Sequence, residues 1–221
     1  MGGEYYTGHW SFSSWDKYSQ CPFRFKCKYI LHIPDPAGPA ADRGTRLHQT
    51  AQDFIEAKRD DLTEEFYHLR PFYRELRDVR ALCELEWAFL RDWTPCAYAH
   101  PSAWLLTKTD AIYSPAPGKL VIVDHKSGKI YEDKHEMQTE LYAVSGFILH
   151  PNAEEIKTTL AYIDKNHKQS RTYQRAQLQG LIKKWEVRVR PMYLDNIWPM
   201  RANEYCGTCP YRKDNGGPCQ Y

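Results

Sequence analysis

The segment TKTDAIYSPAPGKLVIVDHKSGK, residues 107–129, decides the fold. Apolar and β-branched residues on both sides of a Pro- and Gly-rich run predict two strands joined by a tight turn near Pro117. Side chains alternate along a strand, so Asp124 and Lys126 share one face while Val123 points to the other. An apolar strand that ends in an acid and a base on one face is the first sign of a chemical site.

Two carboxylates face each other across this predicted hairpin. With a turn at Pro117, Asp110 falls roughly opposite Asp124, at about 5 Å if the two residues pair directly. Carboxylates that close repel each other, and a hard divalent cation such as Mg²⁺ between them removes the repulsion. Lys126 then projects beside the metal, where its ammonium can position a water and stabilise charge on a phosphate. A surface hairpin with a plain ion pair is the simpler interpretation, and the apolar strand, the second Asp and Gly128 argue against it.

Helical and strand patterns follow one another along the rest of the chain. Ser13 or Ser14 is predicted to cap a first helix within residues 11–33, and residues 34–42 are predicted to form a loop. The helix after the last strand is expected to bend or end near Pro191. Further helices are predicted over 44–58, 133–150 and 178–196, and strands over 81–90, 103–114, 120–129 and 155–166, with 170–177 as a short partner.

This order predicts an α/β fold in which a mixed central sheet is flanked by helices, with an N-terminal helical segment and a C-terminal Cys-rich tail. We expect residues 1–221 to form a single domain. Its parts are a helical region at 11–80, a core at 81–195, and a tail at 196–221 joined to Cys21.

Composition limits the classes of protein. The chain has 221 residues, is 42% hydrophobic and carries a net charge of +2, which neither demands nor excludes a nucleic-acid partner. No run of 18 apolar residues occurs and the start lacks a secretory signal, so no membrane span and a cytoplasmic, reducing location are expected. Seven Cys in that setting are unlikely to form a disulfide framework.

Three of the Cys lie in the tail. Cys206-x-x-Cys209 is a metal or redox signature, and Cys219 follows in a Gly-Gly-Pro turn. Cys21 is the first candidate for a fourth ligand, and Cys27 is the reserve. Four thiolates of this kind can hold an iron–sulfur cluster or a mononuclear Zn²⁺.

Five short motifs in order along the chain resemble the PD-(D/E)XK nuclease superfamily, and more closely its RecB-type branch. That branch typically shows G-x-x-x-H on a helix, an acid on a following strand, an Asp before a hairpin, D-x-K-[TS]-G, and Q-x-x-x-Y on a helix. The matching residues are Gly44-Thr45-Arg46-Leu47-His48, Glu86 (or Glu84), Asp110, Asp124-His125-Lys126-Ser127-Gly128, and Gln138 through Tyr142.

The resemblance implies a restriction-endonuclease-like fold and a role for each of these residues. His48, Asp110, Asp124 and the main-chain carbonyl of Val123 would bind Mg²⁺ or Mn²⁺. The catalytic set would be Asp110, Asp124, Lys126, Glu86, Gln138 and Tyr142. Glu86 is preferred to Glu84 because it lies deeper in its strand, and His125 is left out because it points to the opposite face.

The resemblance also implies a cofactor and a substrate. In a subset of RecB-type nucleases, including AddB-like and CRISPR-associated ones, one Cys before the core and three after it hold a [4Fe–4S] cluster. Here Cys21, Cys206, Cys209 and Cys219 would do so, with Zn²⁺ as the alternative. The expected function is a DNA exonuclease acting on single-stranded ends, in recombination, phage DNA metabolism or CRISPR adaptation, with protein partners possible. The competing class is a non-cleaving DNA-end-binding or redox-sensing protein on the same fold.

Overall fold

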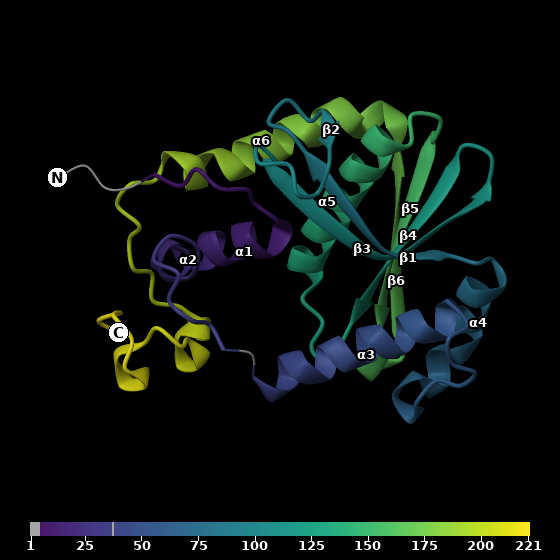
Figure 1. Cartoon of the computed structure of the whole chain (residues 1–221), viewed down its shortest axis with the longest axis horizontal. Helices are drawn as coiled ribbons and strands as arrows, with labels where there is room; N and C mark the ends of the chain where they lie inside the picture. Colours follow the sequence, from purple (N-terminus) through teal and green to yellow (C-terminus); the bar gives the residue numbers. More distant parts are fainter. Residues whose placement is uncertain (1–4, 37) are drawn as a thin grey trace. The chain divides into compact units, whose positions relative to one another are not determined.

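The computed structural model describes residues 5–36 and 38–221, apart from the side chains of Glu132 and Asp133 (Figure 1). The chain forms two compact units. The sheet unit is Pro39–Lys183, and the terminal unit combines the residues up to Gly38 with Lys184–Tyr221. The single domain expected for residues 1–221 stays a prediction.

The sheet unit is built on a six-stranded mixed sheet with the strand order β2-β1-β3-β4-β5-β6. Neighbouring strands are antiparallel except for β4 and β5, which run parallel and are connected by helix α5. A parallel pair needs such a crossover because its strands start at the same edge of the sheet. The strands are β1 (Leu82–Phe89), β2 (Pro95–Cys96), β3 (Leu105–Ala116), β4 (Lys119–Lys126), β5 (Glu155–Tyr162) and β6 (His167–Gln174).

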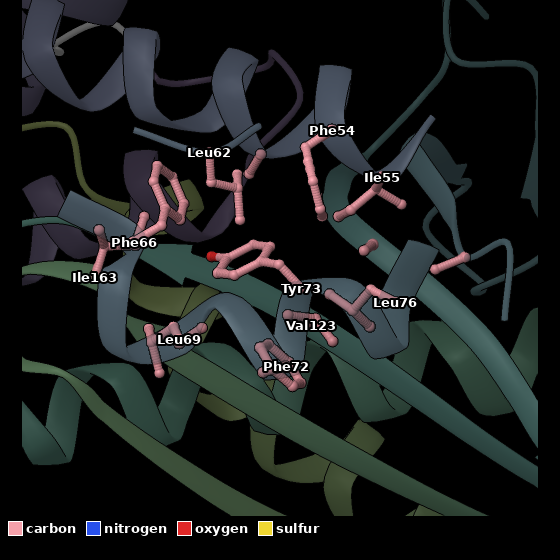
Figure 2. Packing of buried hydrophobic residues seen from close by; sticks show 14 of the residues in the cluster. Phe54, Ile55, Leu62, Phe66, Leu69, Phe72, Tyr73, Leu76, Val123 and Ile163 are labelled. Carbon is pink, nitrogen blue, oxygen red and sulfur yellow. The ribbon is translucent and has the colours of Figure 1, made fainter. Parts of the chain in front are cut away.

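One face of the sheet is covered by α3 (Pro39–Ile55), the 3-10 helix η1 (Glu64–Leu69) and α4 (Arg70–Asp78). The apolar stripe of α3 and the buried side of α4 pack on small and β-branched residues of the middle strands, such as Val123 (Figure 2). Tyr73 lies in the middle of this cluster and is fully buried. This core fixes α3, the helix that carries His48, against β3 and β4.

Helix α5 (Glu132–Leu149) packs on the other face. Gly146 allows the helix to approach closely, because a Cβ there would lie 2.8 Å from Ile156 Cδ1 and 3.0 Å from Ile122 Cδ1. Every residue from Leu141 to Phe147 is buried, so this half of the helix is enclosed on all sides. Its first turns reach the end of β4, which places polar residues of α5 beside Asp124.

The terminal unit is held by aromatic rings rather than by a sheet. Trp15 packs edge-on to Trp185 at 5.1 Å between ring centroids, and its indole N–H donates to the Arg188 carbonyl oxygen at 3.0 Å. Phe25 stacks on Trp198 with ring centroids 5.6 Å apart. Its helices are α1 (Phe12–Gln20), α2 (Pro22–Tyr29) and the second half of α6 (Leu178–Leu194), and its short 3-10 turns are η4 (Glu204–Thr208) and η5 (Lys213–Asn215). Two further 3-10 turns, η2 (Ile163–Lys165) and η3 (Arg175–Gln177), flank β6 in the sheet unit.

Two local predictions were wrong. Ser11, and not Ser13 or Ser14, caps α1, with Ser14 returning the second bond of the capping box. Helix α3 already begins at Pro39, inside the predicted loop, because proline is well suited to a first helical turn. Helix α6 passes through Pro191, which is exposed together with Val187 four residues earlier, and ends three residues later at Leu194, near the proline as expected.

The fold class predicted from the sequence is confirmed: an α/β fold with a mixed sheet flanked by helices. Among the described residues, no helix combines the length and apolar character needed to cross a membrane.

Candidate active site

The open end of the β3–β4 hairpin brings Asp110 and Asp124 to the same level. The strands pair Ala111 with Val123, and the two acids are the next residues beyond that pair. Asp110 retains 9% of its surface and Asp124 only 4%. Buried carboxylates require partners, and each of the two has its own set.

Asp124 is held by residues of β4 and α5. Tyr142 donates its hydroxyl to Asp124 Oδ1 at 2.8 Å, and Gln138 Nε2 donates to the same oxygen at 3.3 Å. Lys126 Nζ lies 2.6 Å from Asp124 Oδ2 and donates to Gln138 Oε1 at 2.6 Å. Gln138 and Tyr142 are four residues apart on one helix face, and the amide also donates to the phenol oxygen at 2.9 Å. The structure thus joins four of the predicted site residues in one network.

Asp110 is held from the other side, by α3 and the main chain. His48 Nδ1 lies 3.3 Å from Asp110 Oδ1, and the backbone N–H of His125 donates to Asp110 Oδ2 at 2.5 Å. The His125 side chain turns away and shares a hydrogen bond of 3.1 Å with the Tyr73 hydroxyl in the core. His125 therefore positions Asp110 through its backbone.

These surroundings shift the pKa values of the two acids in opposite directions. Burial raises the pKa of Asp124, and the negative charge of Asp110 adds to that effect against the opposing Lys126 charge. Burial would also raise the pKa of Asp110, but the hydrogen bond from His48 and the neighbouring imidazoles outweigh it and lower the pKa to about 2. Burial lowers the pKa of His48, whereas its bond to Asp110 reverses that and raises the pKa above the ordinary value. One acid is firmly ionised and the other resists ionisation, as two nearby carboxylates do.

Glu84, and not Glu86, lies at this site. The ligand atoms of Glu84, His48 and Asp110 all lie within 4.8 Å of one another. Glu86 is exposed, and its nearest charged partner is Lys108, with Oε1 and Nζ 3.8 Å apart. The preference for Glu86 assumed a regular strand, but Glu84 has a φ of +56°, in the left-handed region that a non-glycine residue rarely adopts. This conformation costs about 1–2 kcal/mol and is typical of residues held in place at functional sites.

The residues present fit a divalent metal ion. An imidazole and two carboxylates provide nitrogen and oxygen ligands of the kind that Mg²⁺ and Mn²⁺ accept. A cation here would also favour the ionised form of both Asp110 and Asp124. Asp124 is outside the group of three, since its oxygens face Lys126 and Tyr142. The Val123 carbonyl stays a predicted ligand.

An open cleft in the sheet unit leads to this group. Its walls come from α3 and from strands β1 and β3, and His48, Glu84 and Asp110 lie along it. Sequence reasoning missed the other polar residues of the cleft, although their spacing carried a signal. Three share the α3 face of His48, and the fourth is two residues before Asp110 on its strand: Thr45, Gln49, Gln52 and Lys108.

The terminal unit has a second candidate site. Cys21, Cys206, Cys209 and Cys219 line the same pocket. The structure therefore brings together the four Cys that the sequence singled out, although Cys21 is 185 residues from Cys206. Cys27 is fully buried and lies close enough for Cys209, Cys219 and Cys21 to help burial raise its pKa to about 11.

A mixed sheet whose hairpin end carries an acid pair, a lysine and a group of potential metal ligands is the arrangement of a nuclease with a restriction-endonuclease-like core. The chain belongs to the PD-(D/E)XK nuclease superfamily, whose family description matches residues 9–213. The predicted D-x-K element, Asp124-His125-Lys126, lies within the matched residues.

Two solved structures are similar to this chain. The crystal structure of a "putative exonuclease" from Eubacterium rectale has a TM-score of 0.55 and 14% identity, covering 92% of this chain and 88% of that one. The protein SSO0001 has 15% identity and a TM-score of 0.49, over 93% of this chain and 85% of its own. At such identities the likeness shows the fold alone. No curated protein matches the sequence.

Proposed function

We propose that this protein is a metal-dependent deoxyribonuclease that removes nucleotides from DNA ends, with single-stranded ends as the preferred substrate. The observation that carries the proposal is the convergence of His48, Glu84 and Asp110 beside the Asp124–Lys126 pair. The exonuclease character rests on the likeness to RecB-type nucleases. It agrees with the name of the Eubacterium rectale protein, whose similarity by itself speaks only for the fold.

The residues divide the chemistry between them. His48, Glu84 and Asp110 would hold Mg²⁺ or Mn²⁺, with Asp124 completing the negative charge of the site. The metal, when bound, polarises the phosphate and supplies positive charge for the transition state. Lys126 would orient the attacking water, since its ammonium is half-buried and fixed between Asp124 and Gln138. Tyr142 and Gln138 would hold that pair at the required angle.

The proposal is tested with purified protein and end-labelled single- and double-stranded DNA in Mg²⁺, Mn²⁺ or chelator. Lys126→Ala should reduce metal-dependent cleavage to a small residual rate and leave DNA binding unchanged. The matched control is Lys119→Ala, the same change at the other end of β4, where Lys119 pairs with Glu155 at the surface at 3.1 Å. Cleavage by Lys126→Ala at the wild-type rate would refute the assigned role. A wild-type protein that binds DNA ends and never cuts them would show the non-cleaving class instead.

We also propose that Cys21, Cys206, Cys209 and Cys219 bind a [4Fe–4S] cluster. They line one pocket, yet no three Cys sulfurs within the described residues lie within 4.8 Å of one another. The preference for the cluster over Zn²⁺ rests on the resemblance to RecB-type nucleases that hold one.

Anaerobic purification tests this cofactor directly. The protein should be brown, and iron and sulfide analysis should give four of each per chain, as the formula requires. Cys21→Ser should lose the colour, whereas Cys83→Ser should keep it. A colourless protein that contains zinc would overturn the iron proposal, and loss of colour only in Cys27→Ser would move the fourth ligand to that residue. The nuclease proposal includes a cytoplasmic location and protein partners in recombination or CRISPR adaptation.

A further inference from the structure

Asp164 is a junction between three parts of the sheet unit. It lies in η2, two residues beyond β5, and accepts a bidentate pair of hydrogen bonds from Arg43 at 2.7 and 2.8 Å. Asp164 Oδ2, one of the two oxygens bonded to Arg43, also accepts a hydrogen bond from the backbone N–H of Gly128 at 2.6 Å. Bidentate Arg–carboxylate pairs are among the strongest and most directional side-chain contacts.

Both residues that Asp164 holds are close to the proposed active site. Arg43 lies on α3, five residues before His48, and Gly128 is two residues after Lys126. Helix α3 also approaches the segment after β4 directly, because a Cβ on Gly44 would lie 3.2 Å from Ser127 Oγ. The junction therefore links the helix of a proposed metal ligand to the strand end of the proposed catalytic lysine.

The segment after Lys126 needs such a link. Residues 127–131 belong to no strand or helix, and Gly128 adopts a φ of +88° that few other residues tolerate. Without a fixed acceptor, the Gly128 N–H would bond to water instead, and the turn would open more easily. The backbone places Asp164 beside this turn, because Tyr162, two residues earlier, pairs with Lys126 across the sheet.

We propose that Asp164, with Arg43, is a positioning residue for catalysis: it fixes the Lys126–Gly128 segment relative to α3. It does not contact the reacting atoms and acts through Lys126. The inference rests on the proposed nuclease function, because it assigns Asp164 a role in the same reaction.

Kinetics of Asp164→Ala test the role. The kcat should fall about ten- to hundredfold, the loss typical of a misplacement of about 1 Å, while KM stays within about twofold. Asp164→Asn keeps a carbonyl oxygen for Gly128 and should lose less activity than Asp164→Ala. The matched control is Asp60→Ala, which removes the carboxylate partner of Arg77, 3.4 Å away, at an exposed site of the same unit. It should leave kcat unchanged.

A double-mutant comparison separates positioning from a general loss of structure. In the Lys126→Ala background, Asp164→Ala should cause no further loss of the residual activity, because the step it serves is already gone. Losses that multiply, or a fall in the thermal midpoint that accounts for the lost activity, would overturn the proposal.

Hydrogen exchange gives a readout that does not depend on cleavage. The Gly128 amide should exchange slowly in the wild type and in Asp60→Ala, and at least about tenfold faster in Asp164→Ala. Equal exchange in all three would overturn the link whatever the activity. Faster exchange in Asp164→Ala, combined with a wild-type protein that never cuts DNA, would leave the link in place and overturn its catalytic role together with the proposed function.

Discussion

Replacement of Tyr142 by Phe tests the electrostatics of the site with the loss of a single oxygen atom. The hydroxyl accepts a hydrogen bond from Gln138 Nε2 at 2.9 Å and donates one to Asp124 Oδ1 at 2.8 Å, so the variant loses both, the second of them a bond to a buried carboxylate. Such bonds contribute about 1.5–3 kcal/mol. The loss should therefore raise the pKa of Asp124, which burial already raises, still further.

This shift makes the stability difference depend on pH. Because the folded pKa of Asp124 is above its unfolded value, the folded state loses stability as pH rises through that folded pKa. In Tyr142→Phe the folded pKa of Asp124 is higher still. The extra loss of stability in the variant therefore begins near the folded pKa of the wild type and is complete above the folded pKa of the variant. The gap between the two proteins should therefore be small in acid and reach about 1.5–3 kcal/mol at pH values above the variant's folded pKa.

Urea unfolding of the metal-free proteins in chelator, followed by tryptophan fluorescence across this pH range, measures the gap. The control is Tyr173→Phe, which removes a hydroxyl that shares a neutral hydrogen bond of 3.1 Å with Thr139. Thr139 lies on α5, the helix that also carries Tyr142. Its cost should be about 0.5–1.5 kcal/mol and nearly independent of pH. A Tyr142→Phe gap that is constant with pH, or no larger than the control's, would refute the charged, buried state of Asp124.

Three further changes test the fold and the metal group. Gly146→Ala should lower the free energy of unfolding by about 1 kcal/mol in urea denaturation, because overpacking against Ile156 at 2.8 Å exceeds the gain in helix propensity. Gly118→Ala should cost about 1 kcal/mol in the same assay, since its φ is +73° in the hairpin turn. Glu84→Gln should weaken Mn²⁺ binding in calorimetry by at least about tenfold. Glu86→Gln should leave that affinity unchanged, and equal losses in both would contradict the choice of Glu84.

Sequence alone predicted the parts of the site that depend on regular geometry. Alternation along β4 separates Asp124 and Lys126 from Val123, and a turn at Pro117–Gly118 brings Asp110 level with Asp124. Helical spacing places the amide and phenol of α5 on one face. These inferences need only a strand period, a helix period and a short turn.

The remainder depends on tertiary contacts that local patterns do not encode. Alternation puts Glu84 and Glu86 on one face, and only the left-handed backbone at Glu84 separates them. Asp164 follows the end of β5 and shows its role only when Arg43 and Gly128 are seen beside it. Pro191 stays within a helix because it is exposed, which depends on packing rather than on proline itself.

The composition of the terminal unit from both ends of the sequence has a consequence for the order of folding. Trp15 and Arg188, joined by one hydrogen bond, are 173 positions apart, whereas Pro39–Lys183 is continuous. During synthesis the sheet can form early, but the aromatic core of the other unit has to wait for Lys184–Tyr221. Until then the rings of α1 and α2 remain exposed to chaperones and proteases. Insertion of the proposed cluster at the four Cys would then be among the last steps of maturation.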